Sequence, residues 1–299
     1  KEKLKEIEKI FDSLHKKKKK RTKKKKNQDN NNQKITNTSI SLHNTVEDEE
    51  FNDFSNIQKY KIQRTDYTQD PTVITYNERY TLYKGKLKST NEDINIMVLE
   101  ETKDAEIKFK RLVNVLIAAQ HPNLETFIGA VDQPPYVVVT RKVGKKLNKI
   151  LLKRKRKDSM KNRSRTNTIY DNGNRTIIAY KIASAMAYLH SRNIIHRDLC
   201  TSNVTIDENF NPKIINFVNS RFLPEDVSTM SCNQSPSSNF RALELLIVDN
   251  NNYDESVDVF SFSGILFELL TGKPPFYYLD QTDVEDEIKK NHRPEFPSE

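Results

Sequence analysis

Two short stretches hold most of the side chains that could perform chemistry together. They are residues 196–203, HRDLCTSN, and residues 215–218, INFV. Asp198 offers a carboxylate, which can accept a proton or bind a cation, and Asn203 offers an amide oxygen that can bind a hard cation. Asn216 offers a second amide, which brings no negative charge with which to hold a cation tightly. The two stretches therefore combine one carboxylate with two amides.

The elements that must position these residues differ between the two halves of the chain. Runs rich in β-branched and aromatic residues predict strands at 73–76, 80–83, 95–99 and 136–140. Apolar residues at helical spacing predict helices at 104–119, 176–189 and 257–270. Strands followed by helices are typical of an α+β, two-lobed fold.

Positive charge is concentrated at the amino-terminal end of the sequence. The formal net charge is +9, and residues 1–26 contain 14 Lys or Arg against 4 Asp or Glu, so the remainder is nearly neutral. Residues 1–15 have the spacing of a short amphipathic helix, and residues 16–26 form a polylysine block. Such a block can be a solvated tail, a nuclear-import signal, or a contact to nucleic acid or an acidic membrane. Residues 27–59 are polar, and we expect a disordered linker there.

Cysteine content and apolar runs bear on the compartment. Two cysteines, Cys200 and Cys232, in 299 residues argue for a reducing intracellular compartment, the cytoplasm or the nucleus. No apolar run approaches the roughly 20 residues of a membrane span, and no signal peptide is visible. The sequence begins with Lys, so an upstream membrane segment is left open.

Several stretches in a fixed order resemble the protein kinases, and the resemblance spans about residues 60–299. The stretches are 83–86 (YKGK), 94–97 (INIM), 121–123 (HPN), 126–130 (TFIGA), 196–203 (HRDLCTSN), 242–244 (ALE) and 256–271 (SVDVFSFSGILFELLT). The pattern is most similar to the tyrosine-kinase-like branch, whose members mostly phosphorylate Ser or Thr. The resemblance implies a bilobal α+β fold with a small β-rich N-lobe at about 60–140. A large α-helical C-lobe would follow at about 141–299, with a basic insertion at 153–175. This lobe would end after the helix that the family labels G, before the last two helices of the family's C-lobe.

The resemblance also implies which residues would handle the cofactors of the family, ATP and Mg²⁺. Asp198 corresponds to the catalytic base, and Asn203 corresponds to a magnesium ligand. Leu82, Thr140 and Val143 correspond to cofactor-binding positions, with Thr140 as the gatekeeper and Val143 in the hinge.

Four further positions correspond to structural residues of the family. His196 and Phe217 resemble stacked members of the regulatory spine, and Asp258 resembles the anchor of the catalytic loop. Glu244 corresponds to a Glu whose Arg partner would lie beyond residue 299.

The glycine-rich loop that approaches the phosphates in the family has no glycine here. Its three positions would fall near Thr75, Asn77 and Tyr80, whereas the first glycine of the sequence is Gly85. We expect the bulky Tyr80 to fill part of the phosphate space.

Three charged positions of the family have also changed. Met97 stands where a Lys would neutralise phosphates, Leu112 stands where a Glu would pair with that Lys, and Asn216 replaces the Asp that binds magnesium. Lys84 and Lys86 lie on the same face of the predicted strand as Leu82 and could substitute for the missing Lys.

These changes predict a catalytically impaired pseudokinase in which binding of ATP and Mg²⁺ is weak or lost. It would act as a scaffold or an allosteric partner of other signalling proteins or kinases. The survival of Asp198 and Asn203 supports an alternative, a weak or unconventional Ser/Thr protein kinase. A second alternative gives the main role to residues 16–26, as an adaptor to nucleic acid or an acidic membrane.

Overall fold

The structure is a computed structural model that describes residues 54–152, 172–223, 238–246 and 253–297. The chain divides into two compact units, Lys1–Lys59 and Tyr60–Glu299. The basic tail expected at 1–26 and most of the linker expected at 27–59 lie outside the described residues. The end of that linker region is not disordered, because Phe54–Tyr60 forms the 3-10 helix η1.

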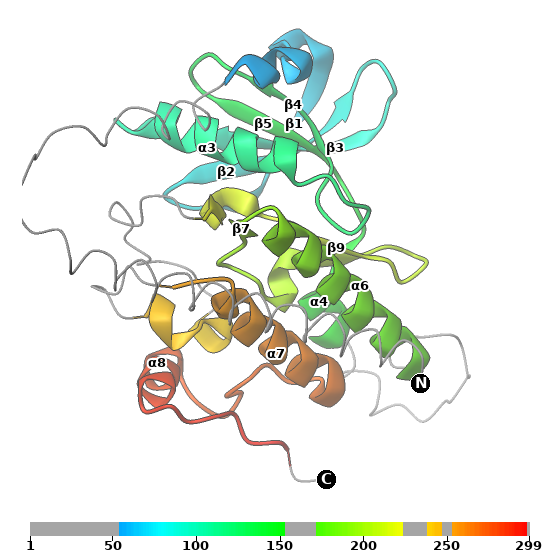
Figure 1. Cartoon of the computed structure of the whole chain (residues 1–299). Helices are drawn as coiled ribbons and strands as arrows, with labels where there is room; N and C mark the ends of the chain where they lie inside the picture. Colours follow the sequence, from blue (N-terminus) through cyan, green and yellow to red (C-terminus); the bar gives the residue numbers. More distant parts are fainter. Residues whose placement is uncertain (1–53, 153–171, 224–237, 247–252, 298–299) are drawn as a thin grey trace, which may run out of the picture. The chain divides into compact units, whose positions relative to one another are not determined.

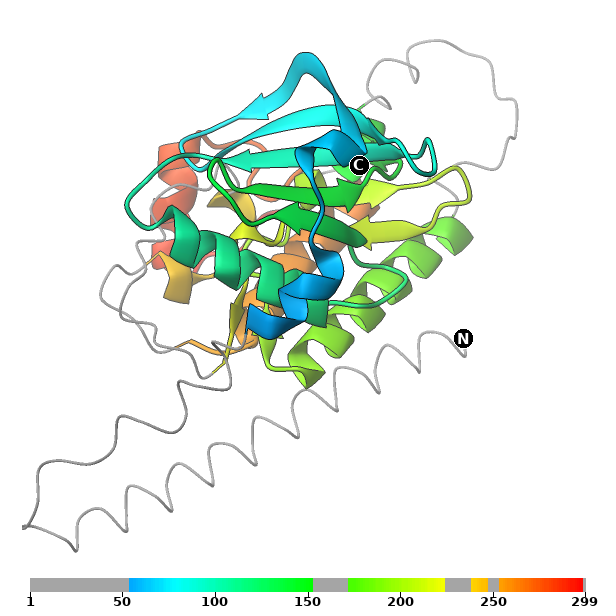
Figure 2. The same cartoon turned by 90° about the horizontal axis from the view of Figure 1, so that it is seen from above.

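The N-lobe of the second unit is an antiparallel sheet with the strand order β1-β2-β3-β5-β4 (Figures 1 and 2). On one face of the sheet, Ile94 and Ile96 of β3 pack against Val137 and Val139 of β5, and all four are fully buried. β3 pairs with β2 on one side and with β5 on the other, so it is the central strand of the sheet. The strands are β1 (Tyr67–Tyr76), β2 (Tyr80–Leu87), β3 (Asp93–Leu99), β4 (Phe127–Val131) and β5 (Val137–Arg141).

Helix α3 (Ala105–Ala118) connects β3 to β4 and runs along one side of the sheet (Figures 1 and 2). Its apolar residues recur at helical spacing, and Phe109, Leu112 and Leu116 are buried. Pro122, four residues after the end of the helix, does not allow the helix to extend toward β4.

The C-lobe is mostly helical, and its two long helices, α6 and α7, lie side by side (Figure 1). Both are rich in buried apolar residues, and α7 ends at Gly272, whose left-handed backbone (φ 69°) allows its N–H to donate to the carbonyl of Glu268. The helices are α4 (Leu147–Leu152), α6 (Asn172–Ser191), α7 (Ser256–Thr271) and α8 (Gln281–Lys289).

Short strands and 3-10 turns carry the catalytic loop between α6 and α7. A three-stranded sheet, β6-β8-β9, and a two-stranded sheet, β10-β7, flank it. These elements are β6 (Lys145–Lys146), β7 (Ile194–Ile195), η3 (Thr201–Asn203), β8 (Val204–Ile206), β9 (Pro212–Ile214), η4 (Phe217–Asn219), β10 (Arg221–Phe222), η6 (Ser238–Phe240) and η7 (Leu243–Leu245).

The architecture confirms the bilobal α+β fold expected from the sequence. One boundary was wrong: α6 begins at Asn172, so residues 172–175 are helical and do not belong to the basic insertion predicted at 153–175. An apolar helix can extend into flanking polar residues, which the pattern alone does not show. Residues 153–171 of the predicted insertion lie outside the described residues.

Candidate functional site

A buried carboxylate from α7 holds the catalytic loop. Asp258 is 1% exposed, and it accepts hydrogen bonds from the backbone N–H groups of His196 (2.8 Å) and Arg197 (2.9 Å). Nε2 of His190 lies 2.9 Å from the same carboxylate. Burial would raise the pKa of Asp258, but the hydrogen bond from His190 and its positive potential hold that pKa below its ordinary value. The ionised carboxylate fixes the start of the loop, where Arg197 has left-handed backbone at φ 65°.

Asp198, Asn203 and Asn216 form one hydrogen-bonded cluster. Nδ2 of Asn203 donates to the backbone carbonyl of Asp198 (2.8 Å) and to its Oδ2 atom (2.9 Å). Nδ2 of Asn216 donates to Oδ2 of Asp198 (3.3 Å) and to Oδ1 of Asn203 (3.2 Å). The structure thus brings together the three residues that the sequence singled out, and amide N–H groups, rather than oxygens, of Asn216 face the other two.

His196 and Phe217 pack against each other beneath this cluster. Their ring centroids are 5.1 Å apart in an edge-on arrangement, and Phe217 is 1% exposed. Nε2 of His196 donates to the carbonyl of Ile215 (3.1 Å), while Nδ1 accepts from the backbone N–H of Asp198 (3.3 Å). His196 therefore links the catalytic loop to the segment that contains Asn216.

The side chain of Asn77 closes the turn between β1 and β2. Oδ1 of Asn77 accepts hydrogen bonds from the backbone N–H groups of Arg79 (2.9 Å) and Tyr80 (3.1 Å). In the kinases, the corresponding turn presents backbone N–H groups to phosphate. The N–H groups of Arg79 and Tyr80 are already occupied here.

Two side chains of this turn reach toward the C-lobe. Nη1 of Arg79 donates to Oδ1 of Asn219 in η4. Burial raises the pKa of Tyr80, and the negative charges of Asp198 and Glu125 raise it further. Tyr80 is half-buried, and the charge of Asp198 in the catalytic loop acts on its hydroxyl.

Met97 and Leu82 are cross-strand partners at the centre of the sheet. Met97 of β3 pairs with Leu82 of β2 and with Val138 of β5, and it is 8% exposed. Its thioether offers no charge to a phosphate. Lys86 does not compensate, because it forms an ion pair with Asp93 (3.3 Å) near the end of β2 that is remote from the β1–β2 turn. Lys84 on the same strand is exposed.

The predicted gatekeeper and hinge lie at the end of β5. Thr140 is 4% exposed and pairs with Asn95 of β3. Val143 follows the strand and precedes Gly144, which has left-handed backbone (φ 48°) and approaches the carbonyl of Ile206 too closely for any Cβ atom. The hinge thus passes directly against the C-lobe strand β8.

Leu112 points into the packed interface of α3. It is 5% exposed and belongs to the buried face of the helix together with Phe109 and Leu116. A carboxylate at this position would need a partner to offset its desolvation, whereas Leu packs without one.

A buried carboxylate that the sequence analysis missed lies behind Thr140. Glu125 is 8% exposed; its Oε1 atom accepts from the Thr140 hydroxyl (2.7 Å), and its Oε2 atom accepts from the backbone N–H of Asn216 (2.9 Å). Burial raises the pKa of Glu125, and the hydrogen bonds from Thr140 and Asn216 offset only part of that effect. The available signal for burial was the apolar Leu124 directly before it and Phe127 two residues after it.

Glu244 lies in η7, away from this cluster. Among ion pairs between described residues, none includes Glu244, and the nearby Arg241 faces Glu285 of α8 at 4.0 Å. The structure therefore gathers the predicted residues of the catalytic loop and of 216–217, but it does not bring Glu244 to them.

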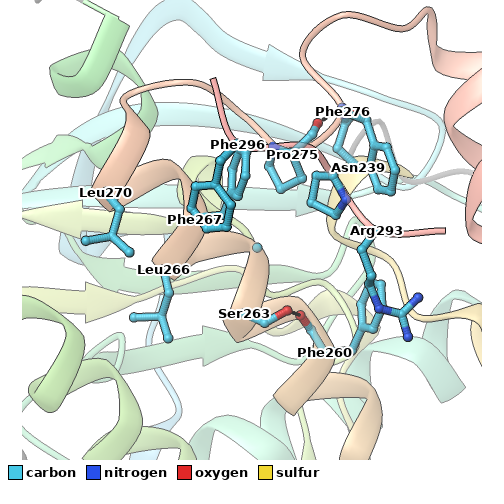
Figure 3. Close-up of a pocket in the computed structure, with 12 residues that line it drawn as sticks. Asn239, Phe260, Ser263, Leu266, Phe267, Leu270, Pro275, Phe276, Arg293 and Phe296 are labelled. Carbon is cyan, nitrogen blue, oxygen red and sulfur yellow. Dashed lines mark hydrogen bonds between the residues drawn. The ribbon is translucent and has the colours of Figure 1, made fainter. Parts of the chain in front are cut away.

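A separate apolar pocket is lined by residues of α7 and of the C-terminal segment (Figure 3). Phe267 contacts Phe296 of the C-terminal segment at 5.0 Å between ring centroids, and the Arg293 guanidinium lies 5.5 Å from the Phe260 ring (Figure 3). Phe296 and Leu270 remain 68% and 60% exposed. None of the residues that line this pocket belongs to the catalytic cluster.

No helix in the described segments is long and apolar enough to cross a membrane. No group of three or more His, Cys, Asp or Glu side chains in the same segments is arranged to hold a metal ion.

Comparison with known proteins identifies the family. The family model for protein tyrosine and serine/threonine kinases matches residues 76–299. The serine/threonine-protein kinase STY46 of Arabidopsis thaliana is 30% identical over 220 residues, which are 72% of this chain and 36% of that protein. The dual specificity protein kinase shkB of Dictyostelium discoideum is 29% identical over 240 residues, or 76% of this chain and 35% of that protein.

The chain belongs to the protein tyrosine and serine/threonine kinase family. It spans only about a third of the length of these two relatives. The family uses ATP and Mg²⁺ for phosphoryl transfer.

Proposed function

We propose that this chain is a pseudokinase of the tyrosine-kinase-like branch, with weak or no binding of ATP and magnesium. Its role would be that of a scaffold or allosteric partner of other signalling proteins or kinases. The assignment to this branch rests on the sequence resemblance, and the named relatives include serine/threonine and dual-specificity kinases. The preserved packing of His196 with Phe217 and the anchoring of the loop by Asp258 support a folded domain that other proteins can recognise.

The observation that carries the proposal is the composition of the cluster, in which the neutral amide of Asn216 lies against Asp198 and Asn203. A magnesium ion requires oxygen ligands and is held mainly by negative charge. Here Nδ2 of Asn216 donates to Oδ2 of Asp198 and to Oδ1 of Asn203, while its own Oδ1 atom is buried without a hydrogen-bond partner and carries no formal charge with which to hold a cation. Asp198 is the one carboxylate of this cluster. The residues present therefore do not fit a tightly held Mg²⁺.

The phosphate side of the site supports the same conclusion. Asn77 occupies backbone N–H groups of the β1–β2 turn, Tyr80 lies near Asp198, and Met97 supplies no positive charge. Phosphoryl transfer depends on positioning and on neutralisation of phosphate charge. A base at Asp198 without a positioned nucleotide has no phosphate to transfer.

The test is a phosphotransfer assay with ATP-Mg²⁺ and a generic protein substrate. We expect the wild-type chain and the Asp198→Ala variant to give the same background incorporation, with an active relative as the positive control. Phosphate transfer by the wild type that disappears in Asp198→Ala would overturn the proposal.

The second candidate is a weak Ser/Thr protein kinase. The observation that favours it is the retained pair of Asp198 and Asn203, joined at 2.9 Å in an anchored loop. This candidate predicts incorporation that depends on Asp198 in the same assay, so one experiment separates the two functions.

Residues 16–26 add a proposed accessory role at an intracellular site, in the cytoplasm or the nucleus. Eleven consecutive residues with ten positive charges favour an acidic partner, either nucleic acid or an anionic membrane. Binding through this block should weaken as salt rises and should disappear when residues 1–26 are deleted. Binding that survives the deletion would exclude the tail as the contact.

A further inference from the structure

The segment Asn216–Asn219 is contacted at both ends by side chains of the N-lobe. It contains η4 and follows strand β9. Glu125 contacts its first residue, and Arg79 contacts its last. These contacts are separated by 91 and 140 residues in the sequence, so they join distant parts of the fold.

Arg79 extends from a turn whose backbone is held by hydrogen bonds within the protein. Oδ1 of Asn77 accepts from the N–H groups of Arg79 and Tyr80, and the Arg79 carbonyl accepts from the N–H of Glu100 (3.0 Å). These bonds fix the backbone from which the guanidinium extends. Nη1 of Arg79 then donates to Oδ1 of Asn219, whose carbonyl also accepts from Nη1 of Arg197 (3.4 Å).

The Glu125 contact joins the same segment to the strand β5. One carboxylate oxygen accepts from Thr140, and the other accepts from the backbone N–H of Asn216, which has left-handed backbone at φ 72°. A non-glycine residue in this region carries a conformational cost that the surroundings must offset. The hydrogen bond from Asn216 to a buried acceptor supplies part of that compensation.

We propose that Arg79 and Glu125 form a built-in clamp that holds the Asn216–Asn219 segment and the two lobes together in the absence of nucleotide. The clamp replaces bonds that a bound nucleotide and its metal would make from the turn and from residue 216. It keeps Phe217 against His196. The inference deepens the proposed function, because a scaffold held in this way presents one surface whether or not ATP is present.

Hydrogen–deuterium exchange of the full, nucleotide-free chain tests the clamp. Arg79→Ala and Glu125→Val should each raise the exchange rates of amides in residues 77–80 and 216–222 by about five-fold, the effect of losing one hydrogen bond. Glu125→Gln should stay close to wild type, because its amide can still accept from Asn216 and donate to the Thr140 hydroxyl. Lys88→Ala is the matched control, since it removes an exposed positive charge at the opposite end of the same hairpin.

A double-mutant comparison identifies the Arg79 partner. In the chain that keeps Arg79, Asn219→Asp should slow amide exchange in residues 77–80 and 216–222, because a carboxylate accepts from guanidinium more strongly than an amide does. It should have no such effect in Arg79→Ala. The proposal is overturned if Arg79→Ala matches Lys88→Ala, or if Asn219→Asp acts equally in both backgrounds. Because no ATP is present, this result does not depend on the phosphotransfer assay.

Discussion

Replacing Asp258 with Asn should sharply destabilise the C-lobe, because three N–H donors converge on this carboxylate. The side chain is 1% exposed, so water cannot replace a lost acceptor. In Asp258→Asn, the new amide nitrogen must face at least one of these donors. Leaving that donor unsatisfied costs about 1–3 kcal/mol, and weakening each of the other two bonds costs about 1 kcal/mol. We therefore expect a loss of about 3–5 kcal/mol in the free energy of unfolding.

Urea unfolding at pH 7, followed by circular dichroism, measures this loss. The matched control is Asp286→Asn, whose carboxylate is 66% exposed and pairs with Lys289 at 3.6 Å on the surface of α8. A surface pair of this kind contributes at most about 1 kcal/mol. If Asp258→Asn unfolds within about 1 kcal/mol of wild type, Asp258 is not the anchor of the catalytic loop.

Two further substitutions test the electrostatics and the packing of the fold. Burial raises the pKa of Glu268, so the folded chain binds this proton more tightly than the unfolded chain does. Its stabilising contribution is full below the unfolded pKa of about 4.3 and is lost as pH rises through the folded pKa. The difference in the free energy of unfolding between wild type and Glu268→Gln (wild type minus variant) should thus fall from pH 4 upward and then level off. A difference that does not change with pH would contradict the role of burial. In Gly85→Ala, the added Cβ would overlap the Thr68 carbonyl and the Ile96 side chain, so urea unfolding should show a loss of about 1–3 kcal/mol, and an unchanged stability would contradict the close packing of β1 on β2.

Regular elements with strong periodicity could be predicted from the sequence. The helix expected at 257–270 is α7, Ser256–Thr271, because apolar spacing and Gly272 mark its course and its end. Three of the four expected strands lie within β1, β2 and β3, and the fourth, at 136–140, matches β5 except that Tyr136 precedes the strand. Strand β4 was not predicted as a strand, because its short apolar sequence, FIGAV, has no alternation and its place is set by pairing with β5.

The contacts that close the site could not be predicted in the same way. Asp198, Asn203 and Asn216 were identified by type and order, but the direction of the Asn216 amide depends on three-dimensional placement. Glu125 follows a proline turn and is of a charged residue type that is usually exposed. Its partners, Thr140 and Asn216, come from other segments. No local pattern connects residues so far apart in the chain.

A titration of the wild-type chain with ATP, with and without Mg²⁺, tests the central claim most directly. Isothermal calorimetry or thermal shift at millimolar ATP would detect nucleotide binding to the folded chain. The neutral amide of Asn216, the position of Tyr80 and the replacement at Met97 predict no magnesium-dependent binding and no shift beyond that of buffer. Saturable binding that strengthens when Mg²⁺ is added would contradict the account.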